Sequence, residues 1–101
     1  ILVTPDGQFL IVHNFTGFFQ LKEMECIEQF QVIQNSIDKI DINIVVNNYF
    51  TKEKYEYILA YWKKYTRNTV KFTLNIVEKI ELSYSGKRRF LIRNPKIELN
   101  I

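Results

Sequence analysis

The segment between residues 51 and 76 constrains the fold most strongly, because two different apolar periods follow one another in it. Five residues recur at the spacing of one face of a helix: Tyr55, Ile58, Leu59, Trp62 and Tyr65. Residues 70–76 then alternate between apolar and polar side chains, as in a strand with one buried face. Thr51 is a suitable N-cap residue. We therefore predict a helix over residues 51–65 whose apolar face packs in a core, followed by a strand over 70–76.

Two further pairs of strands are expected earlier in the chain. The turn sequence TPDG at residues 4–7 lies between two apolar stretches, which predicts a β-hairpin over residues 1–13. Residues 27–34 are strand-like, and residues 40–46 alternate well. A turn sequence at residues 35–38 separates them, so we predict a second hairpin.

The remaining elements complete a recognisable order. We expect a first helix over about residues 15–24, capped by Asn14 or Thr16, and a short final strand at 90–92. Between residues 9 and 77 the order is then β-α-β-β-α-β, the split βαβ arrangement of ferredoxin-like domains. This predicts an α+β fold: an antiparallel sheet with both helices on one face, an N-terminal hairpin and a C-terminal lysine-bearing loop.

Length and composition favour one small globular domain. The chain has 101 residues, of which 47% are hydrophobic, and its net charge is +3. Cys26 is the only cysteine, so no disulfide forms within the chain, and a reducing, cytoplasmic compartment is expected. No signal peptide or membrane-spanning run is present in the sequence. The first residue is Ile1 rather than Met, so we expect a piece of a longer protein.

For most side chains that could react or bind a ligand, a purely structural role is the favoured interpretation. His13 has no second histidine or cysteine nearby, so a surface or half-buried histidine is favoured over a metal ligand, and no metal site is expected. Cys26 is favoured as a small buried residue rather than a nucleophile. Phe15, Phe18 and Phe19 fit the helical pattern less well, so some of them are candidates for a surface that meets another domain.

A basic segment near the C-terminus is the strongest functional candidate. Five of the 14 lysine and arginine residues lie between Lys87 and Lys96, and no acidic residue lies between Leu82 and Ile97. Gly86 directly precedes Lys87 and permits close approach of the backbone to a ligand. A lysine delivered to a dry site stabilises developing negative charge on a phosphate or carboxylate. A solvated turn with a run of cations is the structural alternative.

Four stretches resemble one enzyme family over essentially the whole chain. SGKRRFLI, following VEKIEL, resembles the C-terminal signature of acyl-adenylate-forming enzymes. The resemblance is to the phenylacetate–CoA ligase-like branch, which includes capsular polysaccharide biosynthesis-type proteins and synthetases that adenylylate a deazaflavin coenzyme. LVTPDGQFL, IEQFQVIQNSIDKIDINIVV and FTKEKYEYILAYWKKY resemble the opening hairpin, the second hairpin and the second helix of the branch's small C-terminal domain. The approach to the motif departs from the branch, since Glu81 to Tyr84 replace its usual Pro and Thr.

The resemblance implies that residues 1–101 are the single mobile C-terminal domain of an ATP-dependent carboxylate-activating ligase. Its N-terminal adenylation domain would bind ATP, Mg²⁺ and a carboxylic acid. Lys87 would be the catalytic lysine, and Gly86 the motif glycine, with Arg88 and Arg89 completing the basic loop. Coenzyme A is the expected thiol acceptor, although a carrier-protein thiol also fits. The chain by itself would bind no cofactor and catalyse no reaction.

Two alternatives belong to other functional classes. Ferredoxin-like sheets often bind RNA through stacked aromatic residues and nearby cations, although the strands here lack the aromatic-rich signature of such a sheet. The second alternative is a ligand-sensing or protein-interaction module in which Phe15, Phe18 and Phe19 form a dimer patch. Nucleic acid and membrane are the partners that the sequence favours least.

Overall fold

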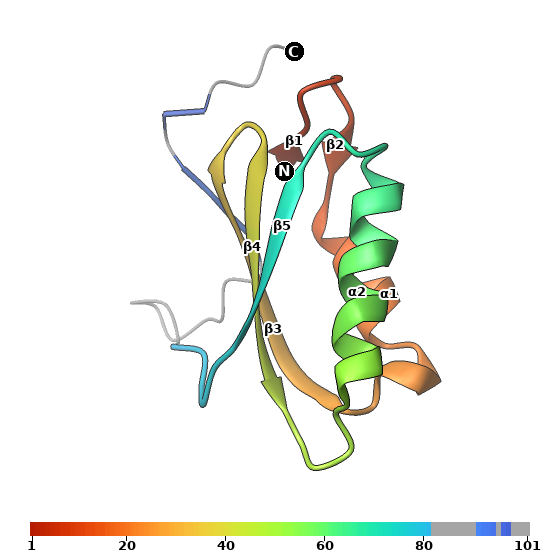
Figure 1. Cartoon of the computed structure of the whole chain (residues 1–101). Helices are drawn as coiled ribbons and strands as arrows, with labels where there is room; N and C mark the ends of the chain where they lie inside the picture. The colour runs from red at the N-terminus through yellow and green to blue at the C-terminus, as the bar shows by residue number, and fades with distance from the viewer. Residues whose placement is uncertain (82–90, 95, 98–101) are drawn as a thin grey trace.

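We analysed a computed structural model, which describes residues 1–81, 91–94 and 96–97. Figure 1 shows two helices packed together on one side of a sheet. The elements in chain order are β1 (Leu2–Val3), β2 (Phe9–Leu10), α1 (Val12–Phe19), a 3-10 turn (Lys22–Met24), β3 (Ile27–Ser36), β4 (Lys39–Val46), α2 (Lys52–Tyr65), β5 (Lys71–Ile76) and β6 (Leu91–Arg93). The expected α+β class is confirmed, and the arrangement is compatible with a ferredoxin-like fold.

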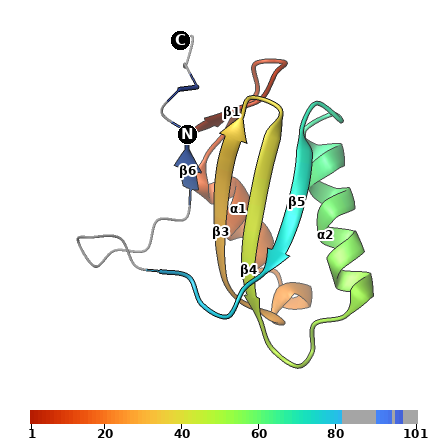
Figure 2. The same ribbon diagram turned by 60° about the vertical axis from the view of Figure 1, so that its left-hand side comes forward.

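The main sheet has four described strands in the order β5-β4-β3-β6 (Figure 2). β3 and β4 form an antiparallel hairpin, with Val32 opposite Ile42. The other two pairs are parallel, β4 with β5 and β3 with β6. The prediction of an antiparallel sheet was therefore wrong, and the sheet is mixed. The α2 crossover returns the chain to the same end of the sheet, which places β5 parallel to β4.

The N-terminal hairpin is confirmed but is shorter than expected. Leu2 pairs with Leu10 and Val3 with Phe9 in a separate two-stranded sheet. The TPDG turn closes with the amide of Gly7 donating to the carbonyl oxygen of Thr4 at 3.0 Å. Gly7 has a φ of 86°, which a glycine adopts without steric cost. Residues 12 and 13, expected in the second strand, are already helical.

Helix α1 begins three residues earlier than predicted, and neither expected residue is its N-cap. Ile11 is the N-cap, and the side chain of Asn14, in the first turn, accepts from the amide of Ile11 at 2.8 Å. The helix ends at Phe19, and a 3-10 turn follows at Lys22–Met24. The prediction of one helix over residues 15–24 was therefore wrong in both boundaries.

Helix α2 matches its prediction closely. Thr51 is the N-cap, and its hydroxyl oxygen accepts from the amide of Lys54 at 3.2 Å. Ile58 and Trp62 are fully buried, while Tyr65 lies at the surface. The helix therefore contributes a narrow apolar stripe to the core rather than a whole face.

An aromatic cluster forms the centre of the core between the helices and the sheet. Trp62 stacks on Phe15 with ring centroids 4.3 Å apart, and Phe19 stacks on Phe30 at 4.6 Å. Phe15, Phe18 and Phe19 are 0%, 3% and 7% exposed. They are core residues, so the prediction that they form an interaction or dimer patch was wrong. Their spacing in α1 puts all three on one face of the helix, which meets Trp62 of α2 and Phe30 of β3.

Candidate functional site

The residues predicted to form the site lie outside the part of the chain that the structure describes. These are Gly86, Lys87, Arg88 and Arg89. The predicted catalytic role of Lys87 therefore stays a prediction. The described residues do show how the chain reaches residue 81 and how it continues from residue 91, and both ends are held by the main sheet.

The chain leaves the sheet after β5 with two points of attachment. The amide of Val77 donates to the carbonyl oxygen of Ile44 at 2.9 Å, which continues the β4–β5 pairing by one residue. Ile80 is only 8% exposed, although it does not belong to the main core cluster. Figure 1 shows this stretch on the side of the sheet opposite the helices. Residues 77–81 are therefore positioned by the sheet.

The chain rejoins the sheet at β6, beside β3. Asn94 then fixes the end of β6 to β3, because its amide donates to the carbonyl oxygen of Gln34 at 3.0 Å. Its side-chain amide donates to the carbonyl oxygen of Asn35 at 3.2 Å, and its side-chain oxygen accepts from the amide of Lys96 at 3.0 Å. This anchor was missed from the sequence, although the Asn94–Pro95 pair is a turn signal.

Gln34 joins this region to the N-terminal hairpin. It is fully buried, and its side-chain nitrogen donates to the carbonyl oxygen of Val3 at 2.6 Å. Its side-chain oxygen accepts from the amide of Val3 at 3.4 Å. The side chain thus pairs with β1 as a neighbouring strand would, while the backbone of the same residue binds Asn94. From the sequence, Gln34 was expected to be an ordinary strand residue. Its amide group at a strand position was the only sign in the sequence that this side chain could bind another segment.

Replacing Gln34 by leucine is expected to destabilise the domain by about 1–3 kcal/mol, because the amide and carbonyl of Val3 lose their partner while buried. Urea unfolding followed by circular dichroism measures the change. Gln29→Leu is the matched control on the same strand, where the side chain is only half-buried, and it is expected to change stability by about 0.5 kcal/mol or less. Equal stability of the two variants would show that Gln34 is not a structural clamp.

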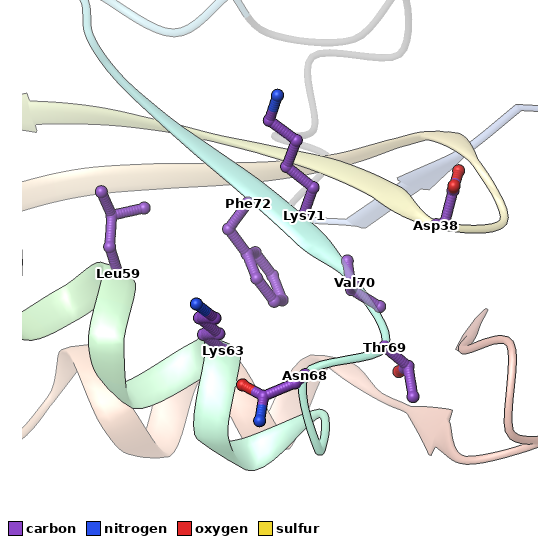
Figure 3. Close-up of a pocket in the computed structure, with 8 residues that line it drawn as sticks. All are labelled: Asp38, Leu59, Lys63, Asn68, Thr69, Val70, Lys71 and Phe72. Atoms are coloured by element: carbon purple, nitrogen blue, oxygen red, sulfur yellow. The ribbon is translucent and has the colours of Figure 1, made fainter.

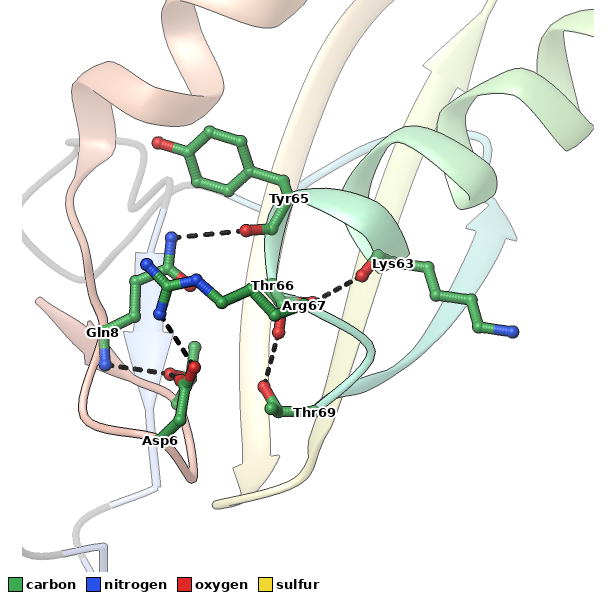
Figure 4. A network of polar contacts seen from close by, with 8 residues as sticks. Asp6, Gln8, Lys63, Tyr65, Thr66, Arg67 and Thr69 are labelled. Atoms are coloured by element: carbon green, nitrogen blue, oxygen red, sulfur yellow. Dashed lines mark hydrogen bonds and ion pairs between the residues drawn. The ribbon is translucent and has the colours of Figure 1, made fainter.

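A polar network holds the first turn against the end of α2 (Figure 4). Arg67 donates to the carboxylate of Asp6 at 2.8 Å, and the hydroxyl of Thr4 donates to the same side chain. Gln8 donates from its side chain to the carbonyl oxygen of Tyr65 at 3.3 Å. Arg67 has a φ of 57°, which is uncommon for a residue with a side chain. The hydrogen bond from Thr4 and the guanidinium of Arg67 lower the pKa of Asp6 below 3.8.

This lowered pKa gives a pH dependence of defined sign. The folded state favours the ionised form of Asp6. The stabilisation by this carboxylate is therefore fully present above the ordinary pKa of 3.8, and it is lost as the pH falls through the lower pKa that Asp6 has in the folded state. Asp6→Asn should therefore lose less stability than wild type when the pH is lowered from about 5 to about 2. Thermal unfolding at a series of pH values measures this. Identical acid sensitivity of the two proteins would contradict it.

A pocket of about 500 Å³ lies between the last turns of α2 and β5 (Figure 3). Its lining combines apolar, amide and hydroxyl groups with two lysines: Asp38, Leu59, Lys63, Asn68, Thr69, Val70, Lys71 and Phe72. Figure 3 shows Phe72 directed toward α2, whereas Lys71 and Asp38 are directed away from it. Asn68 has a φ of 60°, a conformation that asparagine tolerates better than most residues, and its amide closes the end of α2 by donating to the carbonyl oxygen of Lys63 at 2.9 Å. No local pattern in the sequence marks this pocket, because α2 and β5, which form its walls, are brought together only by the crossover between β4 and β5.

The other candidate residues have the structural roles favoured from the sequence. His13 is exposed on α1, and Cys26 is a free, buried cysteine. Within residues 1–81, 91–94 and 96–97, no group of three or more histidine, cysteine or acidic side chains could hold a metal ion. No helix in the same ranges is long and apolar enough to cross a membrane.

The open face of the sheet gives little support to an RNA-binding surface. The aromatic residues in its described strands are Phe30 and Phe72, and both pack against the core on the helix side. The opposite face carries polar pairs, among them Asn75 donating to Asn43 at 3.0 Å and Asn35 donating to Asp41 at 2.6 Å. The described strands therefore offer no aromatic platform on which bases could stack.

Comparison with known families gives one match that covers most of the chain. The family model of the CapK C-terminal domain matches residues 2–94. This range includes both hairpins, both helices and the basic motif from Gly86 to Arg89. A comparison with curated proteins gives no match. The resemblance seen in the sequence was to a C-terminal domain, and the matched family is also a C-terminal domain. The match extends across nearly all of the α+β unit. The chain therefore belongs to the CapK C-terminal domain family.

Proposed function

We propose that this chain is the mobile C-terminal domain of an acyl-adenylate-forming ligase of the phenylacetate–CoA ligase-like branch. The match of residues 2–94 to the CapK C-terminal domain family supports this proposal, because a C-terminal domain is what the resemblance implies and because that range contains Gly86 and Lys87. In this proposal the domain supplies Lys87 to a site formed mainly by an N-terminal adenylation domain. The N-terminal domain binds ATP and the carboxylic acid.

The proposed first step is transfer of an adenylyl group to the acid. A carboxylate oxygen attacks the α-phosphorus of ATP, and the bond to the β-phosphate oxygen breaks, so that acyl-adenylate and pyrophosphate form. Negative charge increases around the α-phosphate in this step, and Mg²⁺ would neutralise part of it. The Lys87 ammonium group contributes a further point charge at the carboxylate and α-phosphate region.

The proposed second step forms a thioester. The sulfur of the acceptor, coenzyme A in this proposal, attacks the acyl carbon and AMP leaves with the carboxylate oxygen that had attacked phosphorus. The thiol proton passes to solvent. The small domain presents a different face to the N-terminal domain in this step, so Lys87 acts in the first step only. Arg88 and Arg89 add positive charge beside Lys87 without a separate catalytic role.

The sheet supports this proposal by holding the chain on both sides of the basic motif, Gly86 to Arg89. Val77 is bonded to β4 at 2.9 Å, and Asn94 is bonded to β3 at 3.0 Å. A charged group acts in catalysis most effectively when it is delivered from a rigid scaffold. The mixed sheet and its two helices are such a scaffold, whereas a freely solvated run of cations would need no such anchors.

The test is acid-dependent exchange of labelled pyrophosphate into ATP, catalysed by the full-length protein in the presence of Mg²⁺. A panel of aromatic, aliphatic and hydroxy acids serves as substrates. We expect exchange that depends on at least one acid of the panel and that the isolated chain does not catalyse. Exchange by the isolated chain, or label appearing in ATP without any acid, would contradict the proposal that the N-terminal domain binds the substrates and this domain supplies Lys87.

A further inference from the structure

β5 is an edge strand with a row of backbone groups that no described strand pairs. It lies at one end of the four-stranded sheet (Figure 2). The amide of Lys71 donates to the carbonyl oxygen of Asp38, directly before β4, at 2.8 Å, and the amide of Val77 donates to that of Ile44 on β4 at 2.9 Å. Backbone groups alternate in direction along a strand. The amides and carbonyls of the even residues 72, 74 and 76 therefore point away from β4, toward the open edge.

A pocket lies at the start of this open edge. The pocket of about 500 Å³ lies where α2 approaches β5, and Leu59, Val70 and Phe72 give it apolar walls. Figure 3 shows the ring of Phe72 and the side chain of Leu59 on two sides of this space. Further along the same side of β5, Ile76 is 56% exposed, although its position in the alternating pattern predicted an inward side chain. An exposed isoleucine at the end of an open edge extends the apolar surface beyond the pocket.

Unpaired positive charge lies on the other side of the same strand. The side chain of Lys71 is directed away from α2 (Figure 3), and it lies opposite Lys39 on β4. Two like charges in directly opposed positions repel each other. Neither lysine forms an ion pair within the described part of the chain. The nearby carboxylate of Asp38 already accepts a hydrogen bond from the hydroxyl of Ser36 at 2.9 Å.

We propose that the β5 edge binds an extended peptide segment that alternates apolar and acidic side chains. The peptide adds a fifth strand to the sheet and bonds to the outward backbone groups of Phe72, Leu74 and Ile76. Its apolar side chains face α2 and fill the pocket, and its acidic side chains lie beside Lys71 on the open face. Backbone pairing supplies affinity in this kind of recognition, and the alternate side chains supply specificity. This site is separate from the basic segment, so the proposal does not depend on the proposed ligase function.

The test uses two blocked hexapeptides, one of alternating valine and glutamate and one of alternating valine and lysine. Each is titrated into the isotopically labelled chain while backbone amide signals are recorded by nuclear magnetic resonance. We expect the glutamate peptide to bind with a Kd below about 1 mM and to slow hydrogen exchange at the amides of residues 72, 74 and 76. The amides of Thr73 and Asn75 already face β4 and serve as internal controls.

Three variants separate the contributions to binding. Lys71→Glu is expected to weaken binding of the glutamate peptide about tenfold, through loss of one charge-assisted contact and gain of a repulsion. Lys96→Glu makes the same charge change after β6, at the opposite edge of the sheet, and should leave the Kd within about twofold. Ile76→Pro removes an outward amide without removing a β4 hydrogen bond, and proline is tolerated at such edge positions. It should weaken both the binding and the protection, while the remaining amide signals stay dispersed.

Several results would overturn the proposal. Absence of glutamate-peptide binding at millimolar concentration is one, and equal binding of the two peptides is another. Protection that maps to residues outside β5 and α2 would also contradict it. If the amides of residues 72, 74 and 76 become protected with increasing protein concentration and no peptide, the edge is used by a second copy of the chain, and the peptide proposal is wrong.

Discussion

We expect acid-dependent pyrophosphate exchange to fall by about 100-fold or more when Lys87 is replaced by alanine in the full-length protein. This is the size expected when a preorganised charged group is removed from a site where negative charge develops in the transition state. Binding of ATP should change little, because the phosphates are held mainly by the N-terminal domain in the proposed mechanism. Exchange rates at saturating ATP, with a separate measurement of ATP affinity, distinguish the two effects.

Two control variants make this result specific. Lys96→Ala removes a positive charge from the same basic segment, and Lys79→Ala removes an exposed lysine that pairs with Glu81 at 3.3 Å. Both should retain exchange within about threefold of wild type, since exposed charges contribute little to a distant step. Lys87→Arg keeps the charge but changes its shape, so partial activity is expected. Unchanged exchange in Lys87→Ala would show that the resemblance assigns the wrong residue.

Replacing Trp62 by alanine is expected to lower the free energy of unfolding by about 3–5 kcal/mol. Trp62 is 0% exposed, and its ring lies 4.3 Å from Phe15 and 5.4 Å from Phe18. It therefore joins α1 to α2, and truncation leaves a cavity where the two helices meet. A domain of this size has roughly 5–15 kcal/mol of stability, so this one substitution removes a large part of it. Denaturant unfolding monitored by circular dichroism measures the loss.

Tyr57→Ala is the matched control on the same helix. Tyr57 is 44% exposed, and its ring lies 6.3 Å from Phe18. Its truncation should cost about 0.5 kcal/mol or less, as for most surface positions. Trp62→Phe should cost less than Trp62→Ala, because it retains a ring and removes the indole nitrogen, which is buried without a hydrogen-bond partner within the described residues. A small loss in Trp62→Ala would contradict the aromatic core as described.

Elements with a strong local signal were predicted well from the sequence. Thr51 and the stripe through Ile58 and Trp62 identified α2 nearly to the residue, because capping and helical periodicity are both local properties. The turn at Gly7 was equally clear. The start of α1 was predicted wrongly because the polar residue of its cap lies inside the first turn. The side chain of Asn14 accepts from the amide of Ile11, so the helix begins before the polar residue and not after it.

Tertiary features were predicted less well, because they depend on contacts between distant segments. The parallel pairing of β4 with β5 follows from the α2 crossover and is not encoded in either strand. Ile76 continues the alternating pattern of β5 but extends beyond the core, so it is exposed. Of the candidate site, the basic motif was visible in the sequence, whereas the anchors Gln34 and Asn94 and the pocket beside β5 required the fold.

The most direct measurement of the central claim follows an oxygen atom from the acid to the nucleotide. The full-length protein is incubated with ATP, Mg²⁺, coenzyme A and a carboxylic acid whose two carboxylate oxygens carry a heavy isotope. Mass spectrometry of the nucleotide product then identifies the step. If an acyl-adenylate forms, the released AMP contains a heavy oxygen from the acid, and Lys87→Ala suppresses this product. Unlabelled AMP, or ADP as the nucleotide product, would contradict the assignment of this chain to a carboxylate-adenylating enzyme.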